Sequence, residues 1–173
     1  MIPCLYASTE TKFDNNGIGK LADALSCVIT EKRNGSFELE MMCPADGIHA
    51  ENLEEGNIIL AKPSDTARPQ PFRIYKIATP IDGKLVVKAR HISYQLNFIT
   101  VSPFATTGCT GAAAGLKRYA ASSCPFEIWT DIKSNATFRV SIPSSFRNCL
   151  GGIDGSMLDI YGGEYEWDRY TVK

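Results

Sequence analysis

Residues 70–96 constrain the fold most, because a tight-turn dipeptide stands between two β-rich runs. Asp82-Gly83 separates the run 70–77 from the run 85–96, and both runs are rich in valine, isoleucine and aromatic residues. Asp-Gly accepts the positive φ angles that two-residue hairpin turns require. The stretch therefore predicts an antiparallel β-hairpin.

A second hairpin is predicted nearer the N-terminus. Residues 25–30 and 36–42 flank Asn34-Gly35, which favours a type I′ turn. Hydrophobic and acidic side chains alternate from residue 37 to 41. This alternation predicts a strand with one buried and one solvated face.

Shorter β-rich runs lie at 2–6 and 58–61, a single helical turn is expected near 52–55, and the proline-rich segment 63–71 predicts an exposed loop. Several short strands separated by turns are typical of an antiparallel sheet. The sequence thus predicts a mainly β protein whose first domain, residues 1–97, is an antiparallel β-barrel or sandwich.

The composition changes after Phe98, and residues 98–173 predict a small α+β domain that is incomplete at its C-terminus. The expected elements are a helix at 111–121 capped by Thr110, strands at 125–130 and 136–140 joined through 131–135, helices at 145–150 (capped by Ser144) and 156–161, and a last strand at 164–172.

Composition excludes several classes of function. The chain of 173 residues has 18 basic and 19 acidic side chains, which argues against specific nucleic-acid binding. No apolar run approaches the roughly 20 residues of a membrane span, and no signal peptide is visible. Six irregularly spaced cysteines and two histidines predict reduced thiols, no metal site and no cofactor.

Two rival functions depend on isolated side chains. A cysteine peptidase or cell-wall hydrolase would use Cys109 or Cys149 with His91 as the base. No recognisable spacing supports it, so His91 is interpreted as a hydrogen-bonded framework residue of a strand. A carbohydrate-binding module would use Trp129, Trp167 and tyrosines as stacking platforms, but the aromatic residues are spread through apolar strand patterns.

Three further clusters have a structural explanation. Paired carboxylates can cleave glycosides or bind calcium, but those near the C-terminus alternate along a predicted strand as on a solvated face. The glycine-rich segment 151–156 could bind a phosphate at a helix N-terminus, but the end of a helix followed by a turn explains its glycines equally well. The basic residues of the 68–90 region favour edge protection or a protein–protein contact over nucleic-acid binding. The carboxylates are Asp154, Asp159, Glu164, Glu166 and Asp168, and the basic residues are Arg68, Arg73, Lys76, Lys84, Lys88 and Arg90.

Several motifs, in order along nearly the whole chain, resemble the N-terminal region of siphophage tail-tip proteins. These are the phage minor structural proteins or tail-associated lysins, also described as the prophage tail endopeptidase family. The motifs lie at 23–27, 30–40, 70–75, 89–94, 125–126, 150–152, 155–156 and 161–164. The resemblance implies structural roles for Phe72, Arg73, Tyr75, Asp82, Gly83, His91, Ser93, Tyr94, Gly162, Gly163 and Glu164.

The resemblance also implies a position in the virion. Proteins of this family are similar to baseplate hubs: three copies form a ring that closes the tail tube beneath the distal tail protein. The ring opens to release the tape-measure protein and DNA. Lytic or receptor-binding modules, where present, lie C-terminal to the hub. Hubs of this family are typically longer than 173 residues, so we expect this chain to hold the first barrel and part of the inserted α+β domain, and to act at the tail tip without catalytic residues of its own.

Overall fold

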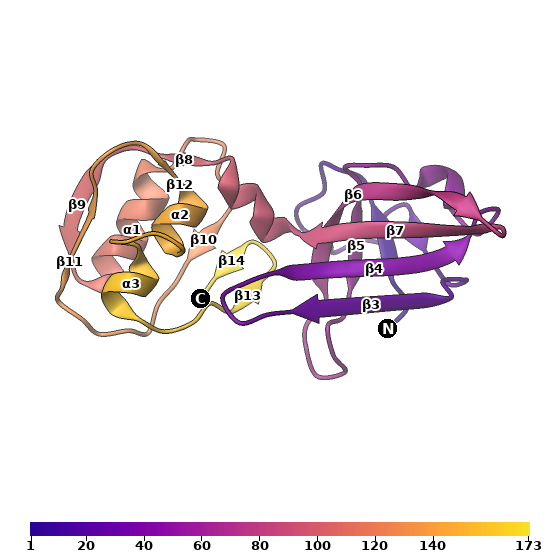
Figure 1. Ribbon diagram of the computed structural model, residues 1–173, viewed down its shortest axis with the longest axis horizontal. Helices are drawn as coiled ribbons and strands as arrows, with labels where there is room; N and C mark the ends of the chain where they lie inside the picture. The colour runs from indigo at the N-terminus through magenta and orange to yellow at the C-terminus, as the bar shows by residue number, and fades with distance from the viewer. The chain divides into compact units, whose positions relative to one another are not determined.

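The computed structural model describes residues 1–173, apart from the side chains at 79–81, and divides into two compact units, Met1–Ile92 and Ser93–Lys173 (Figure 1). The sequence placed the boundary at 97/98. The strand predicted to run to Leu96 ends instead at His91, where the 3-10 helix η2 (Ile92–Asn97) begins. At the end of this helix Phe98 N donates to Gln95 O at 2.9 Å, and the Asn97 side chain donates from Nδ2 to Tyr94 O at 3.0 Å.

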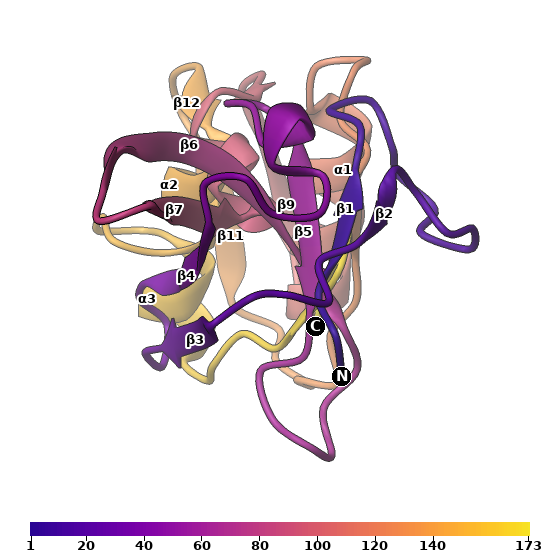
Figure 2. The same cartoon turned by 90° about the vertical axis from the view of Figure 1, so that its right-hand side faces the viewer.

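The first unit is one antiparallel sheet in the order β2-β1-β5-β6-β7-β4-β3. It curls into a half-barrel, from β3 round to β1 and β2 (Figure 2). The mainly β class is confirmed. The strands are β1 (Cys4–Tyr6), β2 (Gly19–Lys20), β3 (Ser26–Glu31), β4 (Phe37–Pro44), β5 (Ile58–Ala61), β6 (Gln70–Ile81) and β7 (Lys84–His91), and the 3-10 helix η1 (Ala50–Asn52) stands before β5.

The two predicted hairpins are present, but only one has the predicted turn. Asp82 and Gly83 have φ angles of 53° and 71°, as a type I′ turn requires. In the β3–β4 hairpin, Gly35 N donates to Lys32 O at 2.9 Å. Of the two residues predicted at the centre of the turn, Asn34 and Gly35, only Asn34 has a positive φ. The predicted type I′ turn centred on Asn34-Gly35 is therefore wrong. Lys32 and Ser36 close a loop of three residues, and the turn within it begins at Lys32, one residue before the start of the predicted turn.

The inner face of the sheet is the apolar core of the first unit. Along β4 every second side chain is buried, as the alternation predicted. The outer side of β1 and β5 is covered as well, because the segment between β1 and β2 folds over it. There the Tyr6 and Phe13 rings meet edge to face at 5.2 Å, and the Tyr6 hydroxyl donates to Asn15 O at 2.6 Å. All residues of β1 and β5 are consequently buried.

A β-bulge interrupts the pairing of β6 with β7. Ile74 lies opposite Ala89 and Lys76 opposite Lys88, so Tyr75 is an extra residue. A bulge bends its strand and changes which face later side chains point to. Tyr75, which is 37% exposed, and the next residue, Lys76, consequently both lie on the outer face.

The second unit combines three helices with short strand pairs around a core that includes Leu116, Phe126, Phe138 and Phe146. This bears out the predicted α+β character. The elements are β8 (Thr100–Val101), β9 (Phe104–Thr107), α1 (Cys109–Tyr119), β10 (Glu127–Ile128), β11 (Thr137–Val140), β12 (Ser144–Ser145), α2 (Phe146–Leu150), α3 (Met157–Tyr161), β13 (Trp167–Asp168) and β14 (Thr171–Val172).

The two strands predicted near 127 and 137 each pair with a different partner. β10 pairs in parallel with β14, and β11 pairs antiparallel with β9. The sequence predicted no strand at the residues of β9. The predicted last strand is a hairpin of β13 and β14, where Arg169 has a φ of 55°.

The helix ends also differ from prediction. Gly108, with a φ of 84°, precedes α1 in place of Thr110, and Ser145 rather than Ser144 caps α2 by accepting from Asn148 N. Gly115 in α1 has a packing reason, since the Phe104 ring occupies the space that a Cβ would fill.

Candidate functional site

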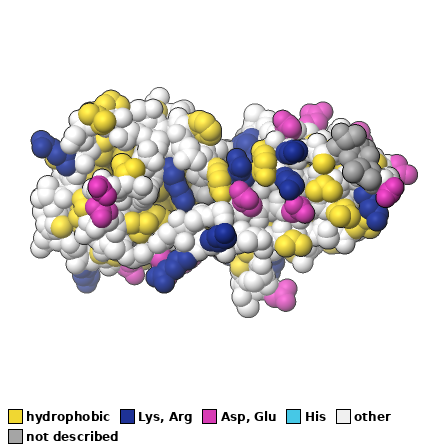
Figure 3. Space-filling view, viewed as in Figure 1, with side chains coloured by type: hydrophobic (Ala, Val, Ile, Leu, Met, Phe, Trp, Pro, Cys, Tyr) yellow, Lys and Arg dark blue, Asp and Glu magenta, His cyan; other side chains and the backbone are white. Residues whose placement is uncertain are grey.

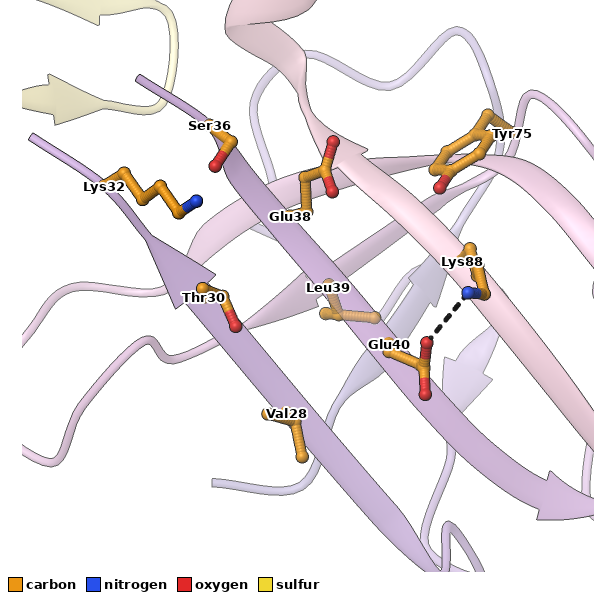
Figure 4. Close-up of a pocket in the computed structure, with 9 residues that line it drawn as sticks. All are labelled: Val28, Thr30, Lys32, Ser36, Glu38, Leu39, Glu40, Tyr75 and Lys88. Carbon is orange, nitrogen blue, oxygen red and sulfur yellow. Dashed lines mark ion pairs between the residues drawn. The ribbon is translucent and has the colours of Figure 1, made fainter. Parts of the chain in front are cut away.

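The most distinctive polar surface is the outer face of β6, β7, β4 and β3. The strand register places Glu38 opposite Arg90 and Glu40 opposite Lys88. Arg90 Nε lies 3.3 Å from Glu38 Oε1. Lys88 Nζ lies 3.1 Å from Glu40 Oε2 (Figure 4). The hydrogen bond to Glu40, together with the attraction to its charge, raises the pKa of Lys88. Both pairs are solvent-exposed, so each contributes little to stability.

A shallow groove of about 450 Å³ runs over this face. Tyr75 forms one side of it and stacks under Arg90, whose guanidinium carbon lies 4.2 Å from the ring centroid. Val28 and Thr30 of β3 form the opposite side (Figure 4). The described residues that line the groove include no cysteine or histidine.

Charges of both signs are interspersed over this face (Figure 3). The sequence interpretation of Lys88 and Arg90 as edge protection is wrong, because β7 lies inside the sheet between β6 and β4. The sequence interpretation also missed that Glu38 and Glu40 neutralise the charges of Arg90 and Lys88. The alternation of glutamates along β4 indicated an acidic row, but the pairing of β4 with β7 was not predicted.

His91 is fully buried at the end of β7. Its ring stacks on Phe37 at 4.7 Å and meets Phe72 edge to face at 5.7 Å. Its Nε2 lies 3.3 Å from the Gln70 side-chain oxygen, also buried. The candidate cysteine nucleophiles belong to the other unit, where Cys109 Sγ lies 3.3 Å from Thr130 Oγ1.

All six cysteines are free thiols. Burial raises the pKa of Cys27 and of Cys149 to about 11 each, from an ordinary value of 9.0. A raised pKa keeps the thiol protonated at pH 8, and only the thiolate is a good nucleophile.

We therefore expect iodoacetamide at pH 8 to alkylate Cys27 and Cys149 far more slowly in the folded chain than in urea, by about a hundredfold for a two-unit shift. Peptide mapping by mass spectrometry measures each rate. The urea-unfolded chain is the control, and equal rates in the two states would contradict the prediction.

The two tryptophans have opposite environments. Trp129 is 57% exposed, whereas Trp167 is 7% exposed beneath the Arg147 guanidinium, which lies 5.0 Å from its ring. Tyr165 donates its hydroxyl to Leu150 O, and burial raises its pKa. A buried Trp167 has no exposed face to stack on a sugar ring, so it cannot serve as one of the platforms of the rival carbohydrate-binding module.

The C-terminal carboxylates have different partners. Lys173 Nζ contacts Glu166 Oε1 at 3.0 Å and Asp168 Oδ2 at 3.1 Å, so these two share one side of the β13–β14 hairpin. Asp159 accepts from Gly155 N at 2.7 Å, and Glu164 is exposed. Within the described part of the chain, no group of three His, Cys, Asp or Glu side chains is placed to hold a metal ion.

The remaining residues named by the sequence resemblance lie in several places. Phe72 is buried, and Arg73 on the outer face of β6 donates from Nη1 to Ser8 O at 3.0 Å and to Gly56 O at 2.6 Å. Ser93 is buried and Tyr94 half-buried in η2. Gly162 and Gly163 both have positive φ and end α3. They do not form one site: Phe72, Arg73, Tyr75, Asp82, Gly83 and His91 belong to the first unit, and Ser93, Tyr94, Gly162, Gly163 and Glu164 to the second.

No protein family matches the sequence, and no curated protein matches it. A solved structure does match the fold: prophage tail protein gp18 from Listeria monocytogenes EGD-e, with a TM-score of 0.67 over 99% of this chain at 12% sequence identity. This chain spans about half, 49%, of that protein. The likeness shows that the two share a fold through both units. No helix in the described part of the chain is long and apolar enough to cross a membrane.

Proposed function

We propose that this chain is a structural part of a phage or prophage tail. One observation carries the proposal: 99% of the chain follows the fold of a prophage tail protein, with a TM-score of 0.67. The ordered motifs at 23–40, 70–94 and 150–164 resemble tail-tip proteins independently of that fold. The groove on the outer sheet face, with its paired charges, suits a protein contact better than a reaction.

The finer proposal is a baseplate hub at the tail tip. In it the chain is the N-terminal part of a tail-associated protein that closes the tail tube and anchors C-terminal modules. The full-length form is a homotrimer that meets the distal tail protein and the tape-measure protein. The role is not enzymatic and needs no cofactor. The enclosure of His91 between Phe37 and Phe72 supports this part of the proposal.

Immunogold labelling tests the position. Particles released by inducing a lysogen that carries the gene are labelled with antibodies against this chain, and antibodies pre-absorbed with the purified chain are the control. We expect gold at the end of the tail opposite the head. Label along the whole tail would reject the proposed position at the tip but support the proposed role in the tail. Unlabelled tails would reject both proposals.

A peptidoglycan assay tests the absence of catalysis. The purified chain should release no soluble fragments from cell walls of the producing host. Turnover that disappears in a His91→Ala variant with an unchanged circular dichroism spectrum would overturn the structural reading.

A further inference from the structure

One row of buried side chains crosses the inner face of the first unit's sheet where β7 ends. The strand register places His91 of β7 opposite Phe72 of β6, and Phe72 opposite Ile59 of β5. On its other side His91 stacks on Phe37 of β4 at 4.7 Å. All four side chains are buried, and His91 is fully enclosed. It is the one member of this row that can take up a proton near neutral pH.

An amide side chain is hydrogen-bonded to the imidazole. His91 Nε2 lies 3.3 Å from Gln70 Oε1, and Gln70 is itself buried. Gln70 Nε2 donates to Arg68 O at 3.5 Å, which directs Oε1 toward His91. The amide oxygen can only accept, so the neutral imidazole donates to it from Nε2. Because this oxygen has no net charge, it stabilises a protonated ring far less than a carboxylate would.

The charged side chains of the neighbouring strands point away from this row or lie in water. On β4, β6 and β7 the charged residue next to the row alternates to the outer face of the sheet. Glu31 of β3 lies opposite Phe37, but it is exposed, so solvent screens its charge. β5 is aliphatic throughout, and η2 has no titratable side chain apart from the phenol of Tyr94. The three outward residues are Glu38, Arg73 and Arg90.

Protonation of His91 places a positive charge between the Phe37 and Phe72 rings, closed off from water. Such a charge is costly to bury unless an opposite charge is buried with it. In the unfolded chain the same imidazole is hydrated and takes up a proton at about pH 6.5. We propose that His91 is an acid-sensitive switch: the neutral ring holds β4, β7 and β6 together at this end of the sheet, and its protonation opens the first unit.

The proton balance gives the direction of the pH dependence. Because the folded chain holds His91 neutral, it binds fewer protons than the unfolded chain below about pH 6.5. The stability that His91 contributes is therefore complete above this pH and is lost as the pH falls. The equilibrium constant of unfolding should rise about tenfold between pH 7.5 and pH 5.5. The switch depends on the first unit alone and is independent of the proposed tail function.

Urea denaturation of the whole chain at the two pH values, followed by far-ultraviolet circular dichroism, measures this change. The chain has two histidines, His49 and His91, which offers a matched pair of variants within the first unit. His91→Gln keeps a polar side chain beside Gln70 but cannot be protonated, so it should lose the tenfold change. His49→Gln, at the imidazole that lies over Gly19, should retain it.

Three results would overturn the proposal: a wild-type chain with equal unfolding constants at the two pH values, a His91→Gln variant that keeps the tenfold change, or a His49→Gln variant that loses it.

Nuclear magnetic resonance keeps the test decisive if His91→Gln does not fold. The His49→Gln variant has a single histidine, so its one imidazole Cε1–H resonance belongs to His91. In the folded chain this resonance should keep its chemical shift from pH 7.5 to pH 5.5, whereas in urea it should move to the position of a protonated imidazole. A folded chain in which the resonance titrates at about pH 6.5, as in the unfolded chain, would contradict the switch.

Discussion

Phe72→Ala is expected to lower the free energy of unfolding by about 3–5 kcal/mol, because it removes a fully buried ring from the centre of the first unit's core. The Phe72 ring meets Phe37 edge to face at 5.1 Å and His91 at 5.7 Å. Its loss leaves a cavity that neighbours from three different strands fill only in part. Urea denaturation followed by far-ultraviolet circular dichroism measures the change.

The matched control is Phe98→Ala, the same substitution at a ring that is 88% exposed. It should change the free energy by no more than about 0.5 kcal/mol, as surface substitutions generally do. If the two variants lost equal stability, the ring of Phe72 would not be the packing centre described above.

Arg73→Ala is expected to cost about 1.5–3 kcal/mol, the usual range for hydrogen bonds made by a charged group. The Arg73 guanidinium joins Ser8 O, in the segment after β1, to Gly56 O, in the turn before β5. Without it both carbonyls lose a donor, and the covering of β1 and β5 is held less firmly. Thermal and urea unfolding measure the loss.

Lys76→Ala, an exposed cation of the same strand, is the control and should be close to neutral. Arg73→Lys should be intermediate, because a single ammonium replaces the planar guanidinium. A Lys76 variant as unstable as the Arg73→Ala variant would show that net charge, rather than the two carbonyl contacts, determines the effect.

Local signals predicted the hairpins correctly. Asp82-Gly83 tolerates the two positive φ angles that it adopts, and the alternation at 37–41 is the burial pattern of β4. Both features are decided within a few residues, where propensity and periodicity are reliable.

Pairings between distant segments were beyond the sequence. β10 and β14 are two residues each, and β9 follows Pro103 in a threonine- and glycine-rich segment that looks like loop. Strands so short carry no periodicity, so tertiary packing decides them. The outer-face site has the same limit: pairing Glu38 with Arg90 and Glu40 with Lys88 needs the β4–β7 register, which no local pattern encodes.

The bulge at Tyr75 has a consequence for comparing this chain with relatives of the same fold. Before it, even-numbered residues of β6 point inward, as Phe72 and Ile74 do. After it, the odd-numbered Ile77 takes the inward position, opposite the buried Val87. Two homologues that differ only in possessing this bulge would have hydrophobic patterns one residue out of phase from this point onward. A correct alignment must therefore open a single-residue gap inside a strand, a place where alignment methods penalise gaps, and at 12% identity little else in the sequence would reveal the need for it.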